Sequence, residues 1–155
     1  MKKLIIMGGV TGSGKSTTAR KILEESGVTG VIYSTDDYWN TPSGEYNFIP
    51  SMIGTAHAWN TRRVEAALET DVELVIVDNT NTTEWERAPF VKLAEKYGYE
   101  VEYRQADSPW WGDIYSRIKS GEISEADVDV LVEKNTHGVP RDTIKKMMNR
   151  YNFPE

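Results

Sequence analysis

Residues 9–16 read GVTGSGKS, a match to the phosphate-loop pattern G-x-x-x-x-G-K-[ST]. The apolar run over 2–8 predicts a buried strand before the loop, and the pattern over 15–26 predicts a helix after it. This strand–loop–helix context is the one in which the pattern binds phosphate, because glycines let backbone N–H groups turn inward and the helix N-terminus adds positive potential. The stretch therefore predicts a nucleotide-binding loop.

Each residue type in the loop suggests a role toward a nucleoside triphosphate. Lys15 is expected to bridge the β- and γ-phosphates, and the hydroxyl of Ser16 is expected to hold Mg²⁺. The residues expected to bind the nucleotide are Gly12, Ser13, Gly14, Lys15, Ser16 and Thr17. The same stretch does not fit G-x-G-x-x-G, so a dinucleotide-binding fold is not supported. ATP and Mg²⁺ are the expected cofactors.

Strand and helix patterns alternate along the rest of the chain. Further strands are predicted over 30–34, 72–81 and 99–106, helices over 50–70 and 82–98, and three more helical patterns in the tail. This alternation predicts an α/β fold of the P-loop NTPase type, with a mostly parallel sheet of about four to five strands flanked by helices. No internal repeat, low-complexity tract or linker is evident, so a single domain over 1–155 is expected.

The composition limits the classes of partner and metal. With 24 acidic and 18 basic residues the net charge is −6, which argues against a non-specific, polycation-like grip on nucleic acid. A nucleic-acid enzyme is still compatible, because a small basic cleft can lie on an acidic body. There is no cysteine and there are only two histidines, so disulfides are excluded and a zinc site is not favoured.

The N-terminal lysines precede an apolar stretch of only five residues that runs directly into the phosphate loop, so we expect no signal peptide. No apolar run approaches the roughly 18 residues that cross a membrane. These observations predict a soluble, cytoplasmic protein without a membrane partner.

A phosphate loop alone does not say what happens to the γ-phosphate. No guanine-reading N-K-x-D pattern occurs, which disfavours a GTPase, and the chain lacks the length and sensor elements of a remodelling ATPase. A small P-loop kinase remains. Such an enzyme works by positioning, charge stabilisation and a base for the acceptor hydroxyl.

Two adjacent aspartates, Asp36 and Asp37, follow the second predicted strand in YSTDDYWN (33–40). Ligands of open α/β sheets bind at the carboxyl ends of the strands. Neighbouring residues in extended backbone point to opposite sides, so one of the two is expected to face the acceptor. The alternative for either aspartate is a helix cap or a turn residue.

A second acidic position follows the most apolar predicted strand, in VDNTN (77–81). Asp78 ends that strand, where a carboxylate can hold the Mg²⁺ shell together with Ser16. Asn81 is expected to contact the substrate or to brace the loop. Its alternative role is the N-cap of the next helix.

Four motifs, in this order and spacing, resemble the phage-type polynucleotide 5′-hydroxyl kinases and, still more, the kinase domain of the Nedd-four-binding-protein-two-like family. They are GGVTGSGKST (8–17), STDDYW (34–39), VDNTN (77–81) and NTHGVPRDTIKKMMNRY (135–151). The resemblance covers nearly the whole chain. It implies a kinase with a helical lid that transfers the γ-phosphate of ATP to a nucleic-acid hydroxyl, most simply a 5′-OH end of DNA or RNA. Carried over, it makes Asp36 the general base, with Asp37 secondary.

The chain departs from the phage-type pattern on the acceptor side. Those enzymes carry an arginine shortly after the aspartate pair, and here Trp39 stands in that region. A base of a single-stranded or flipped-out nucleotide could stack on Trp39 or Tyr38, or these rings could pack under a loop. Arg63 is a candidate for a substrate phosphate. In the lid, Lys134 or Arg141 is expected to stabilise the γ-phosphoryl group.

Other acceptors fit the same ATP-binding half. A hydroxymethyl group on a modified DNA base and a small-molecule alcohol are alternatives within the kinase class. A nucleotide-binding adaptor module with little turnover is the alternative outside it. The oligomeric state is not indicated by the sequence.

Overall fold

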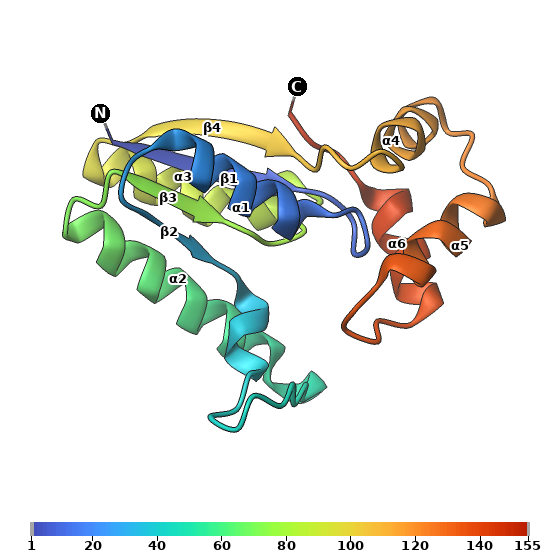
Figure 1. Ribbon diagram of the computed structural model, residues 1–155, viewed down its shortest axis with the longest axis horizontal. Coiled ribbons are helices and arrows are strands. Elements are labelled where there is room, and N and C mark those ends of the chain that lie inside the picture. The colour runs from blue at the N-terminus through green and yellow to red at the C-terminus, as the bar shows by residue number, and fades with distance from the viewer. Residues whose placement is uncertain (1, 155) are drawn as a thin grey trace.

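The computed structural model describes residues 2–154, and its helices and strands follow the predicted alternation (Figure 1). The strands are β1 (Lys3–Gly8), β2 (Gly30–Tyr33), β3 (Leu74–Val77) and β4 (Glu100–Gln105). The helices are α1 (Lys15–Ser26), α2 (Ile53–Glu69), α3 (Glu84–Tyr97), α4 (Trp111–Ser120), α5 (Glu125–Lys134) and α6 (Arg141–Arg150). Two 3₁₀ helices, η1 (Thr35–Trp39) and η2 (Pro50–Met52), lie between β2 and α2.

The four strands form one sheet in the order β2-β3-β1-β4, and every neighbouring pair is parallel. This confirms the predicted α/β fold and parallel sheet. β3 is buried along its whole length, as expected for an interior parallel strand covered on both faces. It stops at Val77, short of the predicted 81, because the following residues turn out of the sheet and Asn81 adopts a positive φ of 46°.

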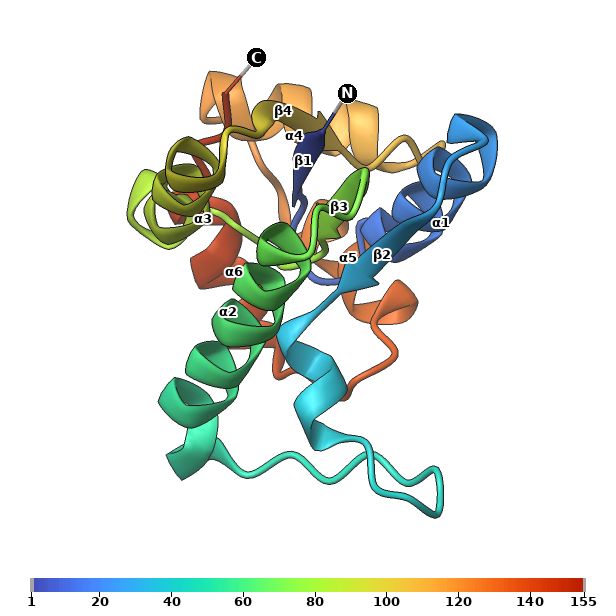
Figure 2. The same ribbon diagram turned by 90° about the vertical axis from the view of Figure 1, so that its left-hand side faces the viewer.

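Helices cover both faces of the sheet (Figure 2). Because successive side chains of a strand point to opposite faces, Leu4 and Ile6 of β1 pack with α2 and α3, whereas Ile5 and Met7 pack with α1. The sheet thus supports α1 on one side and α2 on the other.

The tail helices α4, α5 and α6 form a separate layer beside the phosphate loop (Figure 1). Their apolar side chains share one cluster with Val10 of the loop, including Trp111, Leu131, Ile144 and Met148. The guanidinium of Arg117 donates to both carboxylate oxygens of Asp127, which joins α4 to α5. Within residues 2–154, no helix combines the length and apolar character needed to cross a bilayer.

Candidate active site

The phosphate loop occupies residues 9–14, between β1 and α1. Gly12 and Gly14 both have φ of 88°, a left-handed conformation that glycine adopts without the strain of a Cβ. Helix α1 therefore starts at Lys15 with its N-terminus at the loop. Among the residues that the structure describes, the ammonium of Lys15 has no hydrogen-bond or ion-pair partner, so it is available to a ligand.

Helix α5 packs directly on this loop. A Cβ added at Gly12 would lie 2.3 Å from the backbone oxygen of Leu131, which cannot move without displacing α5. We therefore expect Gly12→Ala to lower the free energy of unfolding by about 2–4 kcal/mol, through left-handed strain and overpacking together. Thermal unfolding measures this. Gly54→Ala on α2, where nothing lies within 4 Å, is the control and should not destabilise; equal melting temperatures for the two variants would contradict the prediction.

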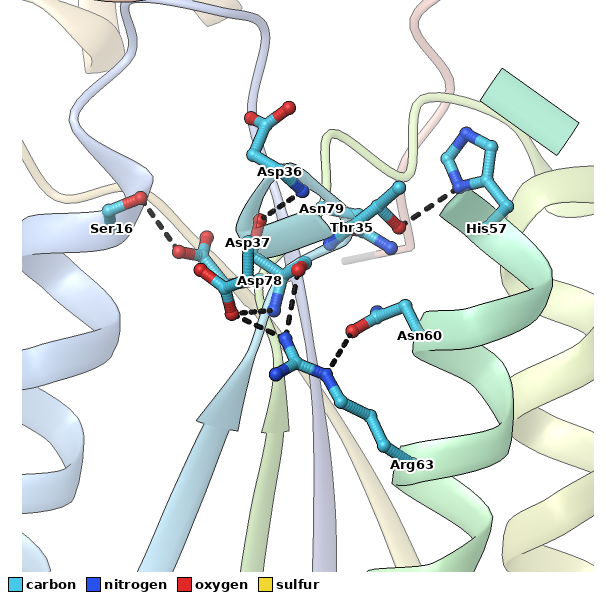
Figure 3. Close-up of polar contacts among 10 residues, drawn as sticks. Ser16, Thr35, Asp36, Asp37, His57, Asn60, Arg63, Asp78 and Asn79 are labelled. Atoms are coloured by element: carbon cyan, nitrogen blue, oxygen red, sulfur yellow. Dashed lines mark hydrogen bonds and ion pairs between the residues drawn. The ribbon is translucent and has the colours of Figure 1, made fainter. Parts of the chain in front are cut away.

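A hydroxyl–carboxylate pair, of which the carboxylate is buried, lies at the start of α1. The hydroxyl of Ser16 donates to Oδ2 of Asp78 over 2.7 Å (Figure 3). Asp78 is only 4% exposed, and its Oδ1 has no hydrogen-bond partner among residues 2–154. A buried carboxylate oxygen without a partner is costly and points to a ligand.

This pair fits the Mg²⁺ that the sequence predicts. In phosphoryl-transfer sites Mg²⁺ is held by one or two protein oxygens, with water and substrate phosphates completing the shell. No group of three or more acidic or histidine side chains suited to a metal occurs in the described part of the chain, so a cage built from protein alone is not present there.

The two aspartates of η1 point in different directions. Asp37 caps the 3₁₀ helix: its Oδ2 accepts the N–H of Ser34 over 3.3 Å and an ion-paired hydrogen bond from Arg63. The carboxylate of Asp36 points away from Arg63 (Figure 3) and accepts the hydroxyl of Tyr46 over 3.3 Å. The capping alternative therefore applies to Asp37. Both aspartates line the cavity described below, but Arg63 neutralises only Asp37.

Arg63 is held by the protein itself, which gives no support to the predicted phosphate contact. Besides Asp37, its guanidinium donates to the carbonyl of Ser34 over 2.9 Å and to Oδ1 of Asn60 over 2.8 Å. It also lies 4.2 Å from the ring centroids of both Tyr33 and Trp59. These contacts attach η1 to α2, so they position the aspartate pair.

The side chain of Trp39 packs against neighbouring rings, as one of the two alternatives predicts. Its side chain is 4% exposed, with the rings of Tyr38 and Phe48 edge-on at 5.2 and 5.0 Å. A nucleobase could stack on Trp39 only by displacing those rings. This packing gives no support to the predicted contact of Trp39 with substrate.

Asn81 braces the loop rather than capping the helix. It is buried, and its Nδ2 donates to the carbonyl of Met7 over 2.6 Å. Thr83 is the N-cap of α3. Two residues before Asn81, Oδ1 of Asn79 accepts the N–H of Thr35 over 2.9 Å, which joins the segment after β3 to η1.

The Ser16–Asp78 pair and the two aspartates of η1 line one cavity of about 300 Å³. It is lined by Ser16, Arg20, Ile32, Ser34, Asp36, Asp37, Asn40, Asp78 and His137. Arg20 is not among the predicted site residues, although it stands one helical turn after Ser16 on α1 and so shares its face. A larger hollow of about 430 Å³, lined by Lys3, Ile22 and Glu73 among others, contains none of the predicted site residues.

The two lid cations have different surroundings. The ammonium of Lys134 lies 4.5 Å from the ring centroid of Trp110, whose indole N–H donates to the carbonyl of Gly12 over 2.9 Å. Lys134 is thus beside the phosphate loop. Arg141 instead pairs with Asp129 and with Glu125 of α5. Of the two predicted residues, the geometry therefore favours Lys134 for the phosphates.

Comparison with known proteins shows the family. The sequence model of a family described as an AAA domain matches residues 4–154, almost the whole chain. The chain belongs to this AAA-domain family. Human NEDD4-binding protein 2 is 38% identical over 148 residues, which is 96% of this chain and 8% of that protein. The mouse 2′,3′-cyclic-nucleotide 3′-phosphodiesterase is 26% identical over 146 residues, which is 94% of this chain and 30% of that protein.

Solved structures agree with the AAA-domain assignment at the level of the fold. A chain of the Pnkp1/Rnl/Hen1 RNA repair complex has a TM-score of 0.65 and 22% identity, and the match covers 96% of this chain and 43% of that one. A sugar kinase from Janibacter sp. HTCC2649 has a TM-score of 0.58 and 16% identity, covering 100% and 80%. The resemblance drawn from the four motifs is confirmed, and the fold is that of P-loop kinases.

Proposed function

We propose that the chain is a kinase that uses ATP and Mg²⁺ to phosphorylate a hydroxyl group of a nucleic acid, most simply a 5′-OH end of DNA or RNA. The observation that carries this proposal is the shared cavity. Asp36 and the Ser16–Asp78 pair line it together, at the phosphate loop. A phosphate site, a metal site and a carboxylate without an arginine or lysine partner, all at one cavity, are what in-line transfer to a hydroxyl requires.

In this mechanism the loop N–H groups and Lys15 hold the β- and γ-phosphates, and Lys134 adds positive charge from the lid. Ser16 and Asp78 would hold Mg²⁺, which would supply positive charge to neutralise the phosphates. The acceptor oxygen forms a bond to the γ-phosphorus while the bond to the β,γ-bridging oxygen breaks. Asp36 orients the acceptor hydroxyl and receives its proton.

Nucleic acid is the proposed acceptor because of the motifs and the relatives. The aspartate pair followed by VDNTN and the lid motif is the pattern of 5′-hydroxyl kinases, and one structural relative is part of an RNA repair complex. A hydroxymethylated base and a small alcohol remain acceptors that the same ATP-binding half would serve.

The test is a transfer screen with γ-labelled ATP. The acceptors run in parallel are 5′-OH DNA, 5′-OH RNA, hydroxymethylated DNA and free nucleosides, with a 5′-phosphorylated oligonucleotide as the blocked control. Label is expected on the 5′-OH oligonucleotides and not on the blocked one. Transfer to free nucleosides alone would overturn the nucleic-acid acceptor, and ATP hydrolysis that no acceptor stimulates would overturn the kinase.

A further inference from the structure

The segment between η1 and α2 folds back over the aspartate pair. The N–H of Thr41 donates to the carbonyl of Glu45 over 2.8 Å, and the N–H of Asn47 donates to the carbonyl of Trp39 over 2.7 Å. A single antiparallel bridge joins Asn40 to Tyr46. These bonds return the chain toward η1 and bring the Tyr46 side chain to Asp36.

A second ring, that of His137 in the loop between α5 and α6, lies near the same carboxylate. The hydroxyl of Tyr46 donates to Oδ1 of Asp36 over 3.3 Å, and Nε2 of His137 lies 3.8 Å from its Oδ2. The two rings are themselves in contact, with centroids 4.7 Å apart and planes tilted by 32°. Partial burial and the neighbouring Asp36 charge raise the pKa of the Tyr46 phenol, so it remains a donor at neutral pH.

Both rings are open to solvent on one side. Tyr46 is 36% exposed and the side chain of His137 is 40% exposed. Seven large apolar side chains are exposed within residues 2–154, and four of them, Tyr46, Phe48, Ile49 and Ile53, fall in one short stretch. Figure 2 shows this segment projecting beyond the sheet. Exposed apolar side chains therefore begin beside Asp36, the proposed general base, and continue along the chain to the start of α2.

We propose that Tyr46, together with His137, is the platform on which the base of the acceptor's terminal nucleotide stacks. The inference rests on the proposed function and specifies its substrate as a base-bearing alcohol. A hydroxyl that reaches Asp36 approaches beside the Tyr46 hydroxyl and the His137 ring, so the group carrying it lies next to these two rings. Aromatic faces bind bases without sequence preference, at about 1–3 kcal/mol per base. Tyr46 thus takes the stacking role that buried Trp39 cannot.

The experiment compares two oligonucleotides that differ only in the base of the 5′ nucleotide: one is complete and the other is abasic there. Dissociation constants are measured by fluorescence anisotropy in the presence of ADP and Mg²⁺. The wild type is expected to bind the complete 5′-OH end about 5- to 150-fold more tightly than the abasic one. Tyr46→Leu should abolish this ratio, and Tyr46→Phe, which keeps the ring, should retain most of it.

Kinetics and a remote control separate stacking from a structural role. Tyr46→Leu is expected to raise the KM for the complete acceptor while leaving the KM for ATP unchanged. Trp85→Leu removes a side chain that is 84% exposed on α3 and should leave the binding ratio as in the wild type. Equal weakening of both oligonucleotides in Tyr46→Leu, or a wild type that does not distinguish them, would overturn the platform. Failure of the proposed function has another signature, absence of transfer, which the binding ratio does not depend on.

Discussion

Asp36→Asn is expected to slow phosphoryl transfer by about 10²- to 10⁴-fold in kcat, with little change in the KM for ATP. The amide can neither accept the proton of the acceptor hydroxyl nor orient it as a carboxylate does. The nucleotide contacts are unaffected, because among the described residues Asp36 contacts Tyr46, His137 and Ser34 and not the phosphate loop. A single-turnover rate with γ-labelled ATP and saturating 5′-OH oligonucleotide measures the loss.

The adjacent carboxylate is the matched control for this variant. Asp37→Asn removes the ion pair with Arg63, which is partly exposed, so we expect a loss of about 1 kcal/mol in unfolding free energy and a much smaller effect on kcat. Thermal unfolding of both variants separates stability from catalysis. If Asp37→Asn abolished transfer while Asp36→Asn kept it, the assignment of the base would be reversed.

The fold was accessible from the sequence because its signals are local. The phosphate loop encodes its own backbone through Gly12 and Gly14, and the apolar run 74–77 identifies an interior strand without reference to its neighbours. The predicted strand end was wrong by four residues for a physical reason. Residues 78–81 are polar and lie beyond the end of the strand. Because they directly follow an apolar strand, the sequence pattern does not mark where that strand ends.

The acceptor side depends on contacts between distant segments, which local patterns do not record. Arg63 of α2 decides which aspartate is ion-paired, and the ring of Phe48 covers Trp39. The meeting of Tyr46 with His137 joins two loops that are far apart in the chain. The nucleotide half of the site was therefore predicted in more detail than the acceptor half.

Lys15→Ala is expected to lower kcat/KM for ATP by about 10²- to 10³-fold, the usual effect of removing one charged group that stabilises a transition state. In the proposed mechanism its ammonium stabilises the negative charge that develops between the β- and γ-phosphates. Because Lys15 has no hydrogen-bond or ion-pair partner among the residues described, the melting temperature without nucleotide should stay at the wild-type value. Activity and thermal unfolding are measured on the same preparation.

Two further variants decide whether this loss reflects the position of the charge or only its presence. Lys15→Arg keeps a cation, but its planar guanidinium does not reproduce the compact ammonium, so we expect only partial recovery of activity. Lys92→Ala removes one positive charge from the exposed surface of α3 and should leave kcat/KM unchanged. If Lys92→Ala and Lys15→Ala lost activity equally, the effect would be one of net charge. If Lys15→Ala transferred phosphate at the wild-type rate, the triphosphate would not bind in the loop as proposed.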